Sequence, residues 1–222
     1  EQDEHLANQL NHYALKRLAY ISKRKQIKLI HISTDYVFDG REQRPYEEDD
    51  ETRPLNNYGK SKRAGELAIL KALPCNGIII RTSSLYSEFG DNFVKKILRL
   101  GSLESELNIV ADQYSSPTYC SDLARIIIFI INKDIFQKFN NQTQIYHYSN
   151  KGCVSWYDFT KKIFELAEVN CIVNPIKSNE FNRAATIPTN SSLSKDKIEK
   201  TLNLKIPKWE ESLTYFIQTL KL

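Results

Sequence analysis

Residues 57–66 read Asn-Tyr-Gly-Lys-Ser-Lys-Arg-Ala-Gly-Glu, and the interpretation of the chain starts from them. The stretch is typical of a helix start, because Asn56 or Asn57 can accept hydrogen bonds from the free N–H groups of a first turn. Tyr58 and Lys62 are four residues apart and therefore share one face of that helix. A nearby ammonium favours the phenolate and lowers the pKa of a phenol, so the two side chains are candidates for an acid–base pair.

This spacing is weak evidence by itself. The chain has 12 tyrosines and 31 lysines and arginines, so a tyrosine four residues before a lysine also arises by chance. The alternative is an ordinary amphipathic helix with an exposed phenol and a solvated ammonium. A second stretch, upstream of the helix, favours the chemical interpretation.

Residues 28–40 contain a short strand followed by polar side chains. The run 29–32 is rich in β-branched residues, which suits a buried strand, and it ends in Ser33, Thr34 and Asp35. Polar groups at the carboxyl ends of strands lie where α/β sheets bind ligands. A hydroxyl there, followed by a helix with tyrosine and lysine, resembles the catalytic arrangement of short-chain dehydrogenases and reductases.

Within the extended branch of that superfamily, the chain resembles the dTDP-4-dehydrorhamnose reductases over nearly its whole length, less closely after about residue 177. The resemblance implies an α/β fold, with a Rossmann-type doubly wound parallel sheet and a smaller α/β substrate lobe. Residues 1–85 would belong to the nucleotide-binding domain and residues 86–222 mainly to the substrate lobe, with segments returning to the sheet. The matching stretches, in chain order, are residues 33–40, 58–62, 81–86 with 90–93, and 110–113 with 116–118.

No glycine-rich phosphate loop of the Gly-x-Gly-x-x-Gly kind occurs, and only 7 glycines are present. Because the first matching residues fall well inside the family pattern, we expect the chain to lack the N-terminal segment that carries this loop. The alternative is a divergent phosphate loop. The residues before 29, however, leave no room for the βαβ units that would carry such a loop. By themselves, residues 1–222 are therefore expected to bind a dinucleotide weakly or not at all.

The resemblance also implies an activity, which is reduction of the 4-keto group of dTDP-4-dehydro-L-rhamnose by NADPH or NADH. Tyr58 would donate a proton to the carbonyl oxygen, Lys62 would lower the pKa of Tyr58 and hold the nicotinamide ribose, and Thr34 would orient the carbonyl. Cofactor contacts are implied for Ser33, Tyr58, Lys62, Thr82 and Ser83. Substrate contacts are implied for Thr34, Asp35, Ser84, Asn92, Phe93, Gln113, Pro117 and Thr118. Mg²⁺ and a homodimer are further expectations from the family.

Several of these side chains have structural alternatives. Ser33 can satisfy local backbone groups, Asp35 can cap a turn, and Arg81 can pair with an acid inside the fold. For Phe93 and His31, packing in the core is the stronger interpretation.

Two positions depart from the family pattern. Ser84 stands where the family has a tryptophan that packs at the sugar, and Ile187 stands where it has an arginine that would pair with a diphosphate. Arg183 could substitute for that arginine. These departures keep two alternatives open: a non-catalytic relative such as the regulatory subunit of methionine adenosyltransferase, and an epimerase or other reductase of sugar nucleotides.

Composition excludes other classes of protein. The net charge of +4 is spread along the chain without the basic stripe expected of nucleic-acid binding. There is no run of about 18 apolar residues and no signal peptide, so we expect a cytoplasmic protein without membrane contact. The 4 cysteines have no Cys-x-x-Cys pair and the 4 histidines no ligand spacing, so no metal site is expected.

Periodicity predicts the remaining elements. The acidic run at residues 47–51 is expected to be a solvated surface loop. Ser121 and Asp122 are expected to cap a helix whose buried side is formed by Ala124 and residues 126–131. Further helices are expected at 4–25, 57–73, 91–101, 156–168, 194–202 and 209–220, and further strands at 78–80, 107–110 and 145–148.

Overall fold

The computed structural model describes residues 3–138, 142–181 and 185–220, and its centre is a three-stranded parallel sheet. The strands lie in the order β1 (Leu29–Thr34), β2 (Gly77–Thr82), β7 (Gln144–His147). Every residue of β2 is buried, as its continuous apolar run predicts for a central parallel strand. The first four residues of β1 are only half-buried. The prediction of a buried strand was wrong there because β1 lies at the edge of the sheet.

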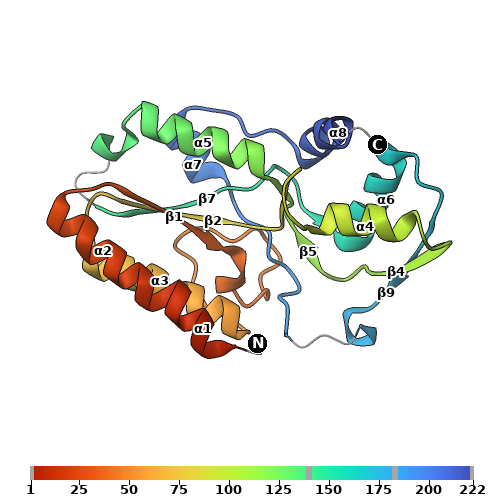
Figure 1. Ribbon diagram of the computed structural model, residues 1–222, viewed down its shortest axis with the longest axis horizontal. Helices are drawn as coiled ribbons and strands as arrows, with labels where there is room; N and C mark the ends of the chain where they lie inside the picture. Colours follow the sequence, from red (N-terminus) through yellow and green to blue (C-terminus); the bar gives the residue numbers. More distant parts are fainter. Residues whose placement is uncertain (1–2, 139–141, 182–184, 221–222) are drawn as a thin grey trace.

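Helices cover both faces of this sheet (Figure 1). The helices α2 (Ala14–Lys25) and α3 (Asn57–Ala72) lie on one face, and α5 (Cys120–Asn132) and α7 (Asp196–Leu202) on the other. Side chains of β2 point alternately to the two faces of the sheet and pack against the helices there. Ile79 packs with Ala19 and Ile69, whereas Ile78 and Ile80 pack with side chains of α5 and α7. The fold class is therefore the predicted Rossmann-type α/β arrangement.

The predicted N-terminal helix is continuous but contains a π-helical turn. It consists of α1 (Glu4–Asn8), η1 (Gln9–Tyr13) and α2. A Cβ added to Gly65 of α3 would lie 2.0 Å from the carbonyl oxygen of Asn11, so the missing side chain permits this close helix contact. The amide of Asn11 also donates to Ser61 Oγ at 3.0 Å.

A second group of elements forms its own core beside the sheet. It contains α4 (Phe93–Gly101), α6 (Trp156–Ala167), α8 (Trp209–Thr219) and the parallel pair β4 (Glu106–Val110) and β9 (Ile172–Ile176). Its buried side chains include Phe159, Ile163, Leu213 and Phe216.

Short strands and turns connect the two groups. The pairs are β3 (Leu85–Tyr86) with β6 (Thr118–Tyr119), parallel, and β5 (Tyr114–Ser115) with β8 (Val154–Ser155), antiparallel. The 3₁₀ turns are η2 (Asp35–Val37), η3 (Ile135–Lys138) and η4 (Ser178–Glu180).

Two predictions for α5 were wrong. The helix begins at Cys120 and no side chain caps it, because Asp122 lies inside its first turn and accepts from Ser212 Oγ at 2.6 Å. Ala124 is exposed, and Ile128 and Ile131 are more than half exposed. Only one side of α5 packs on the sheet, and the apolar run is longer than that side.

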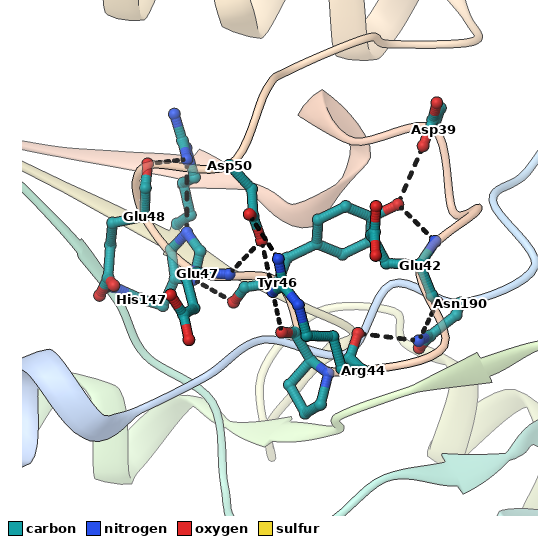
Figure 2. A network of polar contacts seen from close by, with 11 residues as sticks. Asp39, Glu42, Arg44, Tyr46, Glu47, Glu48, Asp50, His147 and Asn190 are labelled. Carbon is teal, nitrogen blue, oxygen red and sulfur yellow. Dashed lines mark hydrogen bonds and ion pairs between the residues drawn. The ribbon is translucent and has the colours of Figure 1, made fainter.

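The prediction that the acidic run at residues 47–51 is a solvated loop was wrong for Glu48, whose surroundings Figure 2 shows. Glu48 is buried, and its carboxylate accepts from the backbone N–H of His147 at 2.9 Å. Asp50 accepts two hydrogen bonds from Arg44, both at 2.8 Å, and one from the backbone N–H of Glu47 at 2.7 Å. These contacts hold the loop after β1 against β7.

Among the residues that the structure describes, no helix is both long and apolar enough to cross a membrane.

The contact at Gly65 gives a test of the fold. We expect Gly65→Ala to destabilise the protein by about 1–3 kcal/mol, because the overpacking cost exceeds the roughly 1 kcal/mol by which alanine favours a helix. Urea unfolding measures this change. Lys60→Ala, at an exposed position of the same helix, is the control and should change stability by less than about 0.5 kcal/mol. A gain of stability in Gly65→Ala would contradict the close contact.

Candidate active site

The carboxyl ends of β1 and β2 meet the first turns of α3 around a cavity of about 320 Å³. Helix α3 is fixed there by its cap, because Asn56 Oδ1 accepts from the N–H of Gly59 at 2.8 Å. A Cβ at Gly59 would lie 2.2 Å from the carbonyl oxygen of Tyr36, so glycine lets the helix approach the turn after β1. The cavity is lined by Ile32, Ser33, Thr34, Asp35, Tyr36, Tyr58, Lys62, Thr82, Ser84, Leu85 and Trp156.

The three predicted catalytic side chains line this one cavity. Tyr58 is 46% exposed as a whole residue. Burial around its hydroxyl raises the pKa of the phenol, a hydrogen bond with Thr34 lowers it, and the charge of Asp35 raises it. The net shift is upward. Thr34 Oγ1 donates to Asp35 Oδ1 at 3.0 Å and accepts from the N–H of Tyr36 at 3.2 Å.

The pKa of Tyr58 is raised, against the lowering expected from Lys62. Lys62 Nζ donates to the carbonyl oxygen of Ile32 at 2.6 Å. The pKa of Lys62 is itself lowered by burial, against the opposing effect of Glu66. The ammonium therefore ties α3 to the end of β1, and burial of the phenol hydroxyl dominates its titration.

A buried ion pair lies directly behind the cavity. Arg81 and Glu66 are almost fully buried and form two hydrogen bonds of 2.9 Å each. Ser33 Oγ donates to the same carboxylate at 2.5 Å, and Arg63 Nη1 does so at 2.8 Å. Burial raises the pKa of Glu66, but the hydrogen bonds and charge of Arg81 outweigh it and leave the pKa below its ordinary value.

Arg81 also connects the cavity to the loop drawn in Figure 2. Its Nη1 lies 3.3 Å from the carbonyl oxygen of Glu48 and 3.3 Å from His147 Nε2. Because an arginine can only donate, Nε2 must accept, and Nδ1 therefore carries the proton that it donates to the carbonyl of Tyr46 at 3.1 Å. Burial and the charge of Arg81 hold the pKa of His147 well below its ordinary value, which agrees with this neutral tautomer.

The other predicted contacts divide into two sets. Ser33, Asp35, Thr82 and Ser84 line the cavity with the catalytic three. The carboxyl of Asp35 is buried, which raises its pKa, and the hydroxyls of Ser191, Ser83 and Thr34 lower it.

The second set lies outside the cavity lining. Ser83 Oγ donates to Asp35 Oδ2 at 2.6 Å, and Asn92 Oδ1 caps α4 by accepting from the N–H of Lys95 at 3.1 Å. Phe93 packs in the second core, and the carbonyl of Gln113 accepts from the N–H of Trp156 at 3.4 Å. Pro117 and Thr118 are buried. The cofactor contact of Ser83 and the substrate contacts of the other residues in this set stay predictions.

The two departures from the family pattern are placed as follows. Ser84 lines the cavity in a left-handed backbone conformation with φ of 48°. Ile187 is half-buried and does not line the cavity. Arg183 lies outside the described residues.

The sequence analysis did not single out Trp156, the first residue of the helix expected at 156–168. The side chain is half-buried and lines the cavity from α6. Its position directly after a helix cap, Ser155, was the available signal, since a first-turn side chain points back past the helix end. No group of three or more His, Cys, Asp or Glu among the described residues could hold a metal ion.

A parallel sheet whose edge brings a hydroxyl, a phenol and an ammonium into one cavity defines a protein of the short-chain dehydrogenase/reductase class. Comparison with known proteins agrees. The family model described as the RmlD substrate binding domain matches residues 1–222, and the chain belongs to this family.

Curated and solved relatives support the assignment. A dTDP-4-dehydrorhamnose reductase of Sinorhizobium fredii is 38% identical over 226 residues, covering 100% of this chain and 76% of the relative. The crystal structure of a dTDP-4-dehydrorhamnose reductase from Clostridium acetobutylicum has a TM-score of 0.92 at 37% identity, covering 100% of this chain and 76% of that one. The enzyme of the same name from Bacillus anthracis, solved in complex with NADP, has a TM-score of 0.89 at 38% identity, covering 99% and 75%.

The buried ion pair gives a prediction about stability. Glu66→Gln should reduce the free energy of unfolding by about 3–5 kcal/mol, because it leaves the buried Arg81 without its counter-charge. Urea unfolding at neutral pH measures this loss. Glu104→Gln, at an exposed position, is the control and should be near neutral.

The pH dependence has a definite sign. Since the folded pKa of Glu66 lies below the ordinary 4.5, its contribution is present above that value and is lost as the pH falls through the folded pKa. The wild type should therefore lose stability more steeply below pH 4.5 than Glu66→Gln does. Parallel pH profiles of the two proteins would contradict the assigned ion pair.

Proposed function

We propose that the protein is an NADPH- or NADH-dependent oxidoreductase that reduces the 4-keto group of dTDP-4-dehydro-L-rhamnose to dTDP-L-rhamnose, a step of nucleotide-sugar biosynthesis. The observation that carries the proposal is the convergence of Thr34, Tyr58 and Lys62 on one cavity, in a member of this family. The relatives named dTDP-4-dehydrorhamnose reductase support the substrate, and the NADP complex of one of them supports the cofactor.

The side chains at the cavity fit a nicotinamide riboside. Lys62 supplies an ammonium, and Ser33 and Thr82 supply hydroxyls, at the sheet edge where such folds bind dinucleotides. Lys62 would hold the ribose, with Ser33 and Thr82 beside it and Ser83 supporting Asp35 from behind. The cofactor, when bound, supplies the hydride.

The remaining chemistry belongs to the protein. The raised pKa of Tyr58 keeps the phenol protonated at neutral pH, which suits a group that must give a proton to the developing alkoxide. The hydroxyl of Thr34 is fixed by Asp35 and by the N–H of Tyr36, so it can orient the carbonyl oxygen without first losing rotational freedom. The partly buried setting strengthens both interactions.

Three further expectations remain proposals. A homodimer is supported by the apolar side chains exposed on the N-terminal helices and α3, among them Leu10, Tyr13, Tyr20 and Leu67. Mg²⁺ binding and a cytoplasmic location rest on the family resemblance and on composition. The division into a nucleotide-binding part at residues 1–85 and mainly a substrate lobe at residues 86–222 is the third; α5, β7 and α7 would be the later segments that return to the sheet.

Tyr58→Phe tests the assignment of the proton donor. In the complete protein, the variant should lower kcat for dTDP-4-dehydro-L-rhamnose by about 10²–10⁴-fold, because it removes general acid catalysis and little else. Oxidation of NADPH or NADH, followed by absorbance, gives the rate. Tyr20→Phe, on the exposed side of α2, is the control and should keep the wild-type rate. Near-normal turnover by Tyr58→Phe would overturn the role.

The same assay separates the alternative function. A wild-type protein with no turnover that co-purifies tightly with a partner enzyme would favour a regulatory subunit.

A further inference from the structure

The cavity has one wall that the proposed chemistry does not use. Ten of its lining residues lie between residues 32 and 85, on the side of the sheet and α3, whereas Trp156 comes from the second core. Of the described residues that line the cavity, it is the one contributed by the substrate lobe. It therefore brings the substrate lobe to the cavity that the catalytic side chains line.

The indole is held rigidly. Ser155 Oγ caps α6 by accepting from the N–H of Asp158 at 3.0 Å, and Thr160 Oγ1 donates to the carbonyl of Trp156 at 2.8 Å. The ring of Phe93 packs against the indole with centroids 4.5 Å apart, and Phe159 lies behind at 6.5 Å. The backbone at Trp156 is thus fixed by the helix start and the indole ring by its aromatic neighbours, which reduces the entropy lost on binding a ligand.

Most of the other residues that line the cavity carry polar side chains. Ser84 lines it with a small side chain, whose hydroxyl donates to Ser115 Oγ at 3.1 Å. Thr34, Tyr58 and Lys62 line the same cavity. A ligand that fits must be polar on one side and apolar on the other. A pyranose ring is such a ligand, because its axial C–H groups form an apolar face and its hydroxyl and keto groups lie at the rim.

We propose that Trp156 is the platform on which the sugar ring of the substrate lies, with the 4-keto group turned toward Tyr58 and Thr34. This inference rests on the proposed function. A flat aromatic surface contributes apolar contact area with little conformational freedom, and a 6-deoxy sugar, which carries a methyl group where other hexoses carry a hydroxymethyl group, adds apolar surface to that contact. Trp156 thereby favours a 6-deoxy sugar and sets its orientation for hydride and proton transfer.

The test separates the sugar from the nucleotide. Trp156→Ala and Trp156→Phe are made in the complete protein, and three quantities are measured: KM for dTDP-4-dehydro-L-rhamnose, the inhibition constant of dTDP, which has no sugar, and the Kd of NADPH. We expect Trp156→Ala to raise KM by about 10-fold or more, with Trp156→Phe in between, as for other losses of apolar contact in a binding pocket. The constants for dTDP and NADPH should stay within about 2-fold, because the inference places only the sugar on the indole.

A matched control is the neighbour Tyr157→Ala, which does not line the cavity and should leave all three constants unchanged. A parallel loss of sugar nucleotide, dTDP and NADPH affinity in both Trp156 variants would show a role in packing alone and overturn the inference. An unchanged KM in Trp156→Ala would overturn it as well. If the wild type binds NADPH but does not turn over dTDP-4-dehydro-L-rhamnose, both the proposed function and this inference fail. A parallel loss of all three affinities, or an unchanged KM, in the variants of an active wild type would overturn the inference alone.

Discussion

The buried pair of Arg81 and Glu66 is the interaction on which the site depends. It joins the end of β2 to the middle of α3, and Ser33 adds the end of β1 to the same carboxylate. A buried ion pair is a poor source of stability, because desolvation of both charges offsets their attraction. Its geometric consequence is larger here. With three elements fixed on one carboxylate, Thr34, Tyr58 and Lys62 are held at the same cavity, and a shift of any one element would break the set.

The same arginine explains why the loop after β1 is ordered. Its guanidinium contacts the carbonyl of Glu48 and the ring of His147, and its positive charge lies 5.1 Å from the ring of Phe38, which stacks on Tyr46. The loop and the catalytic helix therefore share one anchor. An apolar pair of similar volume could fill that space, but it would not orient the loop or Ser33 through directed hydrogen bonds.

Local patterns predicted the parts of the structure that local physics determines. The β-branched run of β2, the cap at Asn56 and the spacing of Tyr58 and Lys62 act over a few residues, and the elements they predict are present. The contacts that escaped prediction join distant segments. Glu48 and His147 are 99 residues apart, so the carboxylate in an acidic run could not be distinguished from its solvated neighbours. Trp156 reaches the cavity only because the second core packs beside the sheet, and periodicity within α6 carries no information about that packing.

The titration of Tyr58 shows the same limit and bears on the direction of catalysis. Spacing correctly placed an ammonium and a phenol on one helix face, but spacing does not give the environment of the phenol hydroxyl. Burial and the nearby Asp35 raise its pKa, while Lys62 is directed to the strand carbonyl of Ile32. A phenol activated as a base would serve the oxidation of an alcohol. A phenol kept protonated serves the reduction of a ketone, because its proton is in place when the carbonyl oxygen acquires negative charge. Burial of the Tyr58 hydroxyl and its proximity to Asp35 therefore fit the role of proton donor that the proposed reduction requires.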